Sequence, residues 1–151
     1  MSLVVTDDLT VRAAAIALIH AAFFGEKMSF HEFVDFCYGK RVIAVVDADG
    51  VIVAASYMFR LRATIASPLW ALDYFCTTPV VAGNGIYIYR RVLSFIASAM
   101  PEVVCVVSGT GNGGSPVNEM LRQVGPHQER MLDAPFGTPV FLFKIEDYRN
   151  D

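Results

Sequence analysis

The chain has 151 residues, of which 54 % are hydrophobic and 18 % are charged, and its formal net charge is −3. This length is typical of a single domain, which we expect to span residues 1–151, and the apolar content excludes a disordered chain. The charge balance, without a basic stripe, argues against a nucleic-acid-binding protein. No apolar run approaches the roughly 20 residues of a membrane-spanning helix, so we expect neither nucleic acid nor a membrane as a partner.

The N-terminus and the cysteines indicate the compartment. The opening segment MSLVVTDDLT carries two aspartates where a secretory signal would carry positive charge. The cysteines Cys37, Cys76 and Cys105 are odd in number, and the last two stand within apolar runs. We therefore expect all of them to be reduced and mostly buried in a cytoplasmic protein. A nucleophilic role for Cys76 would need a base, and no histidine lies near it in the sequence.

The first half of the chain predicts two helices followed by a hairpin. The segment Asp8–Phe24 places its apolar residues on one wide helical face and is followed by Gly25. Ser29 and Glu32, in SFHE, form a capping box, which predicts the start of a second helix. The segment Arg41–Phe59, RVIAVVDADGVIVAASYMF, holds two β-branched runs around a turn, which predicts an antiparallel hairpin.

The second half alternates strands and helices. Pro68 opens a predicted strand, LWALDYFCTT, which we expect at the centre of the sheet with Val103–Ser108 parallel beside it. A helix is predicted over Gly85–Ala99, a short one in VNEMLRQVG and a last strand in TPVFLFKI, and a further short strand near Glu129–Leu132 stays open. Crossovers in this half and the hairpin in the first predict an α+β fold, with a mixed β-sheet flanked by helices on both faces.

The segment TTPVVAGNGIYIYRRVL, from Thr77 to Leu93, joins the predicted central strand to the next helix. Pro79 ends the strand, and Gly83 and Gly85 stand on the turn just before the helical apolar pattern begins. Such glycines let the backbone approach a ligand closely, and the N–H groups at a helix start favour a phosphate. The same residues also suit a tight turn without any ligand, so both interpretations stay open on this evidence alone.

This turn, together with the element order over nearly the whole chain, resembles the GNAT superfamily of N-acetyltransferases. The resemblance implies the acyl-CoA N-acyltransferase fold, acetyl-CoA as the cofactor and an amine as the acceptor. Pro79 matches the family's strand-end proline, and the short late helix that leads to Gly125 matches its closing motif. The cofactor-binding residues that the resemblance implies are Thr77, Ala82, Gly83, Asn84, Gly85, Ile86, Tyr87 and Asn112.

Three departures from the family pattern weaken the expected cofactor site. Ala82 stands where the family usually has Arg or Gln, and Tyr87 stands where a Gly or Ala is usual. The late helix VNEMLRQVG lacks the tyrosine that often serves as the acid for the departing thiolate. The ring of Tyr87 either covers the phosphate-binding N–H groups or turns away from them, and the sequence leaves both arrangements open.

Asp73, in the apolar segment WALDYFC, is the main candidate for a catalytic residue. Acetyl transfer to an amine needs a base for the amine and a donor for the thioester oxygen. Apolar surroundings raise the pKa of a carboxylate, which suits a general base, whereas an aspartate paired with an arginine would be structural. Tyr57 and Tyr74 are further catalytic candidates, as hydrogen-bond donors, although most strand tyrosines are core residues.

Two functions of different classes remain open. One is an acetyl-CoA-dependent N-acetyltransferase acting on a small-molecule or protein amine. The other is a non-catalytic GNAT-fold structural or assembly protein, such as a tailed-phage virion component, which would place the protein in a virion. The high apolar content leads us to expect a homo-oligomer or another protein assembly in either case. We expect no metal, because the histidines are too far apart in sequence for a recognisable motif: His20, His31 and His127.

Overall fold

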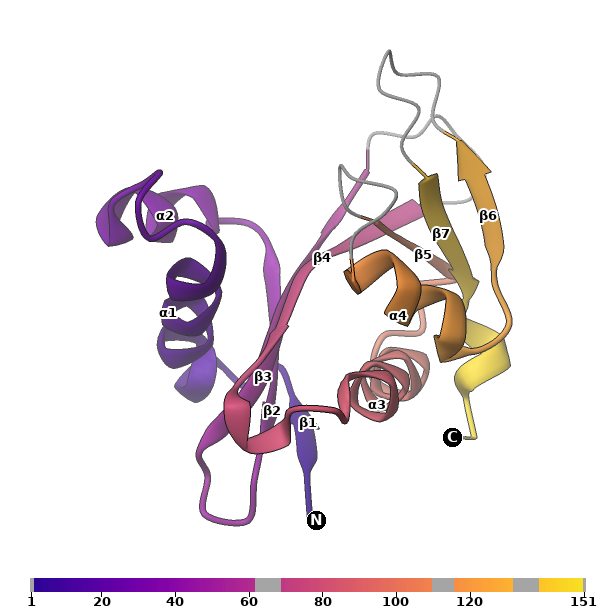
Figure 1. Ribbon diagram of the computed structural model, residues 1–151, viewed down its shortest axis with the longest axis horizontal. Coiled ribbons are helices and arrows are strands. Elements are labelled where there is room, and N and C mark those ends of the chain that lie inside the picture. Colours follow the sequence, from indigo (N-terminus) through magenta and orange to yellow (C-terminus); the bar gives the residue numbers. More distant parts are fainter. Residues whose placement is uncertain (1, 62–68, 110–115, 132–138, 151) are drawn as a thin grey trace. The chain divides into compact units, whose positions relative to one another are not determined.

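The computed structural model describes residues 2–61, 69–109, 116–131 and 139–150 (Figure 1). Within these residues seven strands form one mixed sheet in the order β1-β2-β3-β4-β5-β7-β6. The strands are β1 (Val4–Thr6), β2 (Arg41–Val46), β3 (Ile52–Arg60), β4 (Leu69–Thr77), β5 (Cys105–Ser108), β6 (Gln128–Met131) and β7 (Pro139–Lys144). The helices are α1 (Arg12–Phe23), α2 (Phe30–Phe36), α3 (Gly85–Ala99) and α4 (Pro116–Val124), with 3-10 turns η1 (Leu9–Val11), η2 (Pro79–Val81) and η3 (Ile145–Tyr148). The predicted α+β fold with β4 at the centre of a mixed sheet is confirmed.

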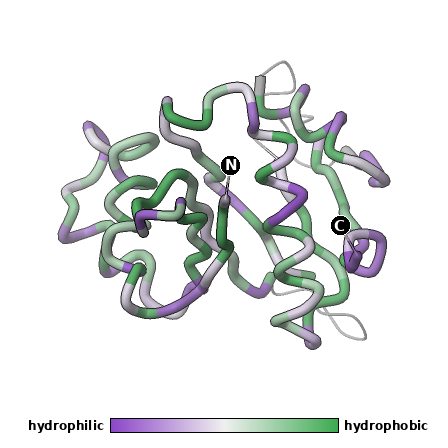
Figure 2. Tube along the Cα trace, turned by 90° about the horizontal axis from the view of Figure 1, so that it is seen from below, coloured by the Kyte–Doolittle hydropathy of each residue, from purple (hydrophilic) through white to green (hydrophobic). Residues whose placement is uncertain are grey.

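The chain divides into two compact units. Unit 1 comprises Met1–Phe59 and Leu72–Gly83, and unit 2 comprises Arg60–Ala71 and Asn84–Asp151. Strand β4 therefore begins in unit 2 and ends in unit 1. Apolar and polar residues alternate in short stretches along the trace (Figure 2). None of the described helices combines the length and the apolar character that crossing a membrane requires.

Unit 1 is built around the predicted hairpin. Strands β2 and β3 are antiparallel, with Ala44 opposite Ala55, and β1 adds to the other edge of β2. The Asp47 carboxylate holds the turn by accepting hydrogen bonds from the N–H groups of Asp49 and Val51 at 2.9 and 3.0 Å. Helix α1 packs against β2, and α2 packs against α1 (Figure 1). The hairpin prediction is confirmed.

In unit 1 side-chain caps precede α2 and the 3-10 turn η1, whereas α1 itself has no side-chain capping hydrogen bond. The Ser29 hydroxyl accepts a hydrogen bond from the Glu32 N–H at 3.1 Å, which confirms the predicted capping box. The Asp8 carboxylate accepts one from the Thr10 N–H at 2.9 Å, but the turn that follows is 3-10, so the α-helix begins at Arg12 and not at Asp8. The β-branched residues at the start of this segment have low helix propensity, which favours the delayed start.

Unit 2 contains the parallel pairing that the sequence predicts. Leu69–Ala71 of β4 pairs in parallel with Cys105–Val107 of β5, and β5 continues antiparallel to β7 and then β6. Helix α3 has the predicted bounds and buries one apolar face against α4 and η3. Val103 belongs to a turn rather than to the predicted strand, because its N–H donates to the Met100 carbonyl at 3.0 Å. The further short strand left open in the sequence is β6, and Pro68 lies outside the described residues.

Candidate functional site

The Asp73 carboxylate lies half-buried on β4 in unit 1. Burial raises its pKa to about 6, which confirms the predicted direction. Within the described part of the chain no cation forms an ion pair with it, so the structural alternative of an arginine-bound aspartate finds no support. The Ser56 hydroxyl donates to the Asp73 backbone carbonyl at 2.7 Å and fixes the main chain at this residue. A base with a pKa close to neutral can take and release a proton at physiological pH.

Tyr74, the next residue, has a left-handed backbone with φ of 55° and is the only described non-glycine residue with positive φ. This conformation costs on the order of 1–2 kcal/mol for a residue with a β-carbon, and such strain concentrates at functional sites. The Tyr74 ring is 40 % exposed, which an aromatic ring in a β-strand core would not be.

Tyr57, on β3, brings the predicted catalytic residues together. Its ring is buried and lies edge-on to the Tyr74 ring, with 5.4 Å between their centroids. Burial raises the pKa of the Tyr57 hydroxyl, and the charges of Tyr74 and then Asp73 raise it further, so both groups act on this hydroxyl. At neutral pH Tyr57 is therefore a hydrogen-bond donor. The sequence named these three residues separately, and the structure places them in one neighbourhood of unit 1.

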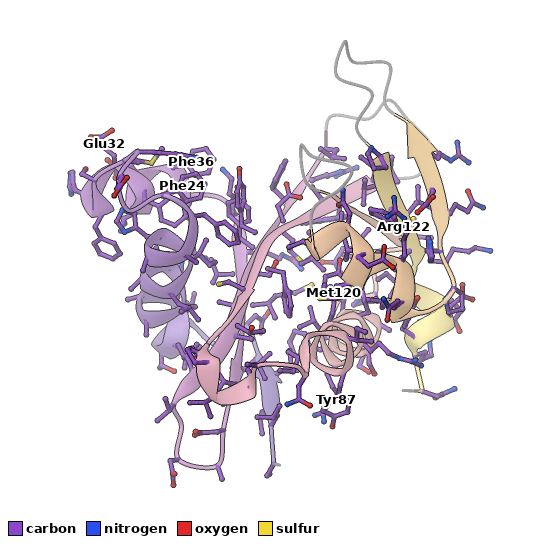
Figure 3. All side chains as sticks on the ribbon, in the orientation of Figure 1. Phe24, Glu32, Phe36, Tyr87, Met120 and Arg122 are labelled. Carbon is purple, nitrogen blue, oxygen red and sulfur yellow. The ribbon has the colours of Figure 1, made fainter. Side chains whose placement is uncertain are left out.

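Further aromatic rings surround these residues, and sequence reasoning did not assign them to the site. Phe23 and Phe24, at the end of α1, lie 5.1 and 4.9 Å from the Tyr74 ring between centroids. Phe36, at the end of α2, lies 6.1 Å from the Tyr57 ring, and Phe24 and Phe36 lie together in Figure 3. We call the aromatic surface the set Phe23, Phe24, Phe36, Tyr57, Phe59 and Tyr74. The signal in the sequence was the density of phenylalanine in AAFFGE and HEFVDF.

The end of β4 carries a cysteine and two threonines. The Cys76 thiol is buried and donates to the Ala55 carbonyl at 3.6 Å, and burial raises its pKa to about 11. It is therefore protonated at neutral pH, which argues against the nucleophilic role. Thr77 is half-buried, and the Thr78 N–H donates to the Val53 carbonyl at 2.8 Å. The buried Thr78 hydroxyl has no hydrogen-bond partner among the described residues.

The turn after η2 leads into α3 through the predicted phosphate-binding residues. Ala82 and Gly83 are exposed, and Gly83 has a φ of 87°, with open space where a β-carbon would stand. Asn84 occupies the N-cap position, but its side chain makes no capping hydrogen bond. The N–H groups of Gly85, Ile86 and Tyr87 have no partner among the described residues. A helix start with free donors and no acid in its first turn can hold an anion.

The ring of Tyr87 is held on the flank of α3. The Arg91 side chain, one turn further along, donates to the Tyr87 hydroxyl at 3.0 Å and lies 5.9 Å from the ring centroid. Figure 3 shows Tyr87 on the side of α3 opposite Met120 of α4. On that opposite side, a β-carbon at Gly85 would lie 3.0 Å from the Met120 sulfur, so glycine permits α4 to approach α3. Arg91 thus determines where the ring lies, which the sequence pattern could not show.

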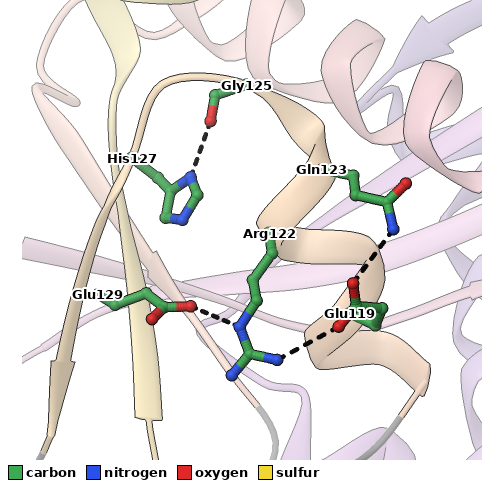
Figure 4. A network of polar contacts seen from close by, with 6 residues as sticks. All are labelled: Glu119, Arg122, Gln123, Gly125, His127 and Glu129. Carbon is green, nitrogen blue, oxygen red and sulfur yellow. Dashed lines mark hydrogen bonds and ion pairs between the residues drawn. The ribbon is translucent and has the colours of Figure 1, made fainter.

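The late helix forms a polar network with β6 (Figure 4). The Arg122 guanidinium donates to the Glu129 carboxylate at 2.6 Å and to the Glu119 carboxylate at 3.4 Å. His127 Nδ1 lies 2.8 Å from the Gly125 carbonyl oxygen, which orients the imidazole over the turn between α4 and β6. These contacts join α4 and β6 within unit 2. Asn112, the last predicted cofactor-binding residue, lies outside the described residues.

Comparison with known proteins identifies the fold. No protein-family model and no curated protein matches the chain. Among solved structures, an aminoglycoside acetyltransferase AAC(6')-Ib in complex with coenzyme A is similar, with a TM-score of 0.68, 8 % identity and 97 % of each chain covered. A GNAT-family acetyltransferase from Staphylococcus aureus gives a TM-score of 0.64 at 10 % identity, covering 95 % of this chain and 99 % of that one. A mutant of the spermidine N-acetyltransferase SpeG from Vibrio cholerae gives 0.66 at 10 % identity, covering 98 % and 96 %. The chain therefore has the fold of GNAT acetyltransferases.

Proposed function

We propose that this GNAT-fold chain is an enzyme that transfers an acetyl group from acetyl-CoA to an amine. The observation that carries the proposal is the half-buried Asp73, which has a pKa of about 6 and no ion-pair partner among the described residues, on the strand that leads into the α3 turn. Burying a carboxylate lowers the stability of the folded protein, and carboxylates with a raised pKa are concentrated at functional sites. The similar structures bear names of acetyltransferases, which supports the reaction class.

The residues at the start of α3 fit the diphosphate of CoA. The N–H groups of Gly85, Ile86 and Tyr87, which have no partner among the described residues, would supply charge-assisted hydrogen bonds, and the helix dipole would add to them. Gly83 leaves its side open, and Asn84 does not occupy the donors with its own side chain. Because the Tyr87 hydroxyl is engaged by Arg91, we infer that the ring leaves these donors accessible. This arrangement supports cofactor binding despite Tyr87, one of the three departures from the family pattern.

The chemistry divides between the cofactor and the protein. Acetyl-CoA supplies an activated thioester: the amine nitrogen bonds to the acetyl carbon, and the carbon–sulfur bond breaks with its electron pair leaving on sulfur. The ammonium form of the acceptor loses two protons overall, one of which ends on the thiol and one in solvent. Asp73 accepts the first of these protons, since its carboxylate is ionised at neutral pH and has no competing cation among the described residues. The hydroxyl groups of Tyr57 and Tyr74 would donate hydrogen bonds to the thioester oxygen.

The experiment that tests this function is a calorimetric titration with acetyl-CoA of the wild type and two matched variants. Gly83→Ala and Gly50→Ala both place a β-carbon in open space at a φ of 87° or 79°. Both should lose on the order of 1 kcal/mol of stability for the same backbone reason. Only Gly83 lies beside the proposed anion site. We expect micromolar binding that weakens about tenfold or more in Gly83→Ala and is unchanged in Gly50→Ala.

Thiol release in the presence of an amine panel completes the test. Acetyl-CoA-dependent release that requires an added amine would establish transfer rather than hydrolysis. A wild type that does not bind acetyl-CoA at millimolar concentration would overturn the proposal. Equal weakening of binding in both glycine variants would show that the α3 turn is not the anion site.

A further inference from the structure

We propose that the acceptor is an amine with one positive charge and an aromatic or large apolar body, bound at the aromatic surface of unit 1 through Tyr74 and Phe36. This inference rests on the proposed acetyl transfer and narrows its substrate class. It would set the protein apart from the similar structures that are named for spermidine and for aminoglycosides, which are polycationic compounds.

Two rings of the aromatic surface are exposed and pack against other rings on their inner side. Tyr74 is 40 % exposed and Phe36 is 42 % exposed. Phe24 stacks on the fully buried Phe33, with 4.8 Å between centroids, and Phe33 also lies 5.9 Å from Phe36. The exposed rings therefore rest on a packed aromatic layer and present π-faces and edges at fixed positions. Such a surface favours a planar or bulky apolar group and gives little to a hydrated chain.

A positively charged side chain of the protein itself already lies over the aromatic surface. The Lys40 ammonium lies 4.0 Å from the Phe36 ring centroid, and 5.8 and 5.6 Å from those of Tyr57 and Phe59. It also donates to the Phe36 carbonyl at 2.7 Å, and the Arg12 guanidinium donates to the Lys40 carbonyl at 2.9 Å. The cation-binding position of the surface is therefore already filled from within the chain. A second positive charge on an acceptor would be repelled by Lys40.

The acidic residues near the aromatic surface differ in their partners. Asp73 is the carboxylate whose charge acts on Tyr57. The acids of α2 have other partners: the Glu32 carboxylate accepts from the Ser29 hydroxyl at 3.2 Å, and the exposed Asp35 lies 3.9 Å from His31. Of Glu32, Asp35 and Asp73, only Asp73 interacts with a ring of the aromatic surface. Recognition of several cations at this place would need several acids.

The test is a binding titration that does not need acetyl-CoA. Calorimetry measures the binding to the wild type of four amines: tryptamine, phenethylamine, n-butylamine and spermidine. A peptide with an N-terminal phenylalanine is titrated as well, to distinguish a small-molecule amine from a peptide N-terminus as the acceptor. We expect tryptamine to bind at least about tenfold more tightly than n-butylamine or spermidine, since all three carry an ammonium and only tryptamine adds a ring that can pack on Tyr74 and Phe36. Preference for spermidine over tryptamine would overturn the proposal.

Three variants and a control locate the binding. Tyr74→Leu and Phe36→Leu should each weaken tryptamine binding about fivefold. If Tyr74→Leu does not fold because of the left-handed backbone at position 74, Phe36→Leu still tests the proposal. Tyr38→Leu is the control, because Tyr38 is 88 % exposed and its ring belongs to none of these contacts. Lys40→Met should raise the affinity for spermidine relative to tryptamine about fivefold. An unchanged ratio in Lys40→Met, or equal losses in Tyr38→Leu, would contradict the assignment.

The two proposals fail in different ways. If acetyl-CoA does not bind, the proposed function fails, while the amine titrations still report on the aromatic surface. If acetyl-CoA binds and is turned over but kcat/KM is higher for spermidine than for tryptamine, the function stands and the substrate class is wrong.

Discussion

The hydroxyl oxygen of Tyr148 occupies the space that a β-carbon on Gly125 would need, because the two atoms would lie 2.8 Å apart. The same hydroxyl donates to the Pro126 carbonyl at 2.7 Å, and Tyr148 is fully buried, so it cannot move without losing this bond. We expect Gly125→Ala to lower the free energy of unfolding by about 1–3 kcal/mol, as measured by urea denaturation. Gly25→Ala is the control, since the nearest atom to its added carbon is the Ala21 carbonyl oxygen at 3.8 Å. Equal losses in both variants would show that the contact with Tyr148 is not the cause.

Ionisation of Asp73 should reduce stability. Burial raises its pKa in the folded state from 3.8 to about 6, so the folded protein binds this proton more tightly than the unfolded chain does. The stability that the proton provides is present below pH 4 and is lost as the pH rises to about 6. Asp73→Asn cannot ionise at this position, so its stability relative to the wild type should rise between pH 4 and pH 7. We expect this rise to be on the order of 2 kcal/mol. Urea denaturation at the two pH values measures this.

A second variant separates this effect from packing. Ser56→Ala removes the hydrogen bond to the Asp73 carbonyl but leaves the carboxylate in place. Its cost, about 0.5–1.5 kcal/mol, should be the same at both pH values. If the stability difference between Ser56→Ala and the wild type instead changes between pH 4 and pH 7 as much as that of Asp73→Asn does, the Asp73 carboxylate is not the cause of the pH dependence.

The same carboxylate predicts a pH–rate profile. If Asp73 is the general base, kcat/KM should fall below about pH 6, where the carboxylate becomes protonated. Asp73→Asn should lower kcat/KM by about 10²–10⁴ and remove this acidic limb. An active Asp73→Asn enzyme with an unchanged profile would remove Asp73 from the mechanism.

Tyr87 should tolerate loss of its ring without a gain in cofactor binding. Arg91 holds the hydroxyl of Tyr87 on the flank of α3, beside the helix and not at its free donors. We expect Tyr87→Ala to bind acetyl-CoA within about threefold of the wild type, a change below 1 kcal/mol. Calorimetry on both proteins checks this. A gain of tenfold or more would show that the ring covers the phosphate position in the wild type.

The contact between Arg122 and Glu129 should depend on salt. The two side chains are 37 % and 44 % exposed, so their attraction is open to screening. Glu129→Gln should lower the thermal midpoint by no more than about 3 °C at low salt, and the difference should shrink in about 1 M salt. Glu26→Gln, at an exposed glutamate outside this network, is the control. A difference that persists at high salt would point to packing instead of charge.

Local patterns in the sequence were enough for most of the elements. Ser29 and Glu32 predicted the start of α2, and Asp47–Gly50 predicted the hairpin, because caps and turns depend on a few neighbouring residues. The bounds of α3 follow from Gly85 and from Pro101, which stops the helix. The half-buried state and raised pKa of Asp73 could also be expected, since its apolar neighbours lie in the same strand.

Only the tertiary structure decided the content of the candidate site. The left-handed backbone of Tyr74 is strain that distant packing imposes, and no local rule for tyrosine in a strand predicts it. The aromatic surface joins the ends of α1 and α2 to β3 and β4, which are separated by many residues in the chain. The Lys40 ammonium lies 5.8 and 5.6 Å from the Tyr57 and Phe59 ring centroids because folding brings β3 beside the end of α2. Amphipathic pattern and capping act over a few residues and are therefore readable from the sequence, whereas side chains that meet across elements are determined by packing.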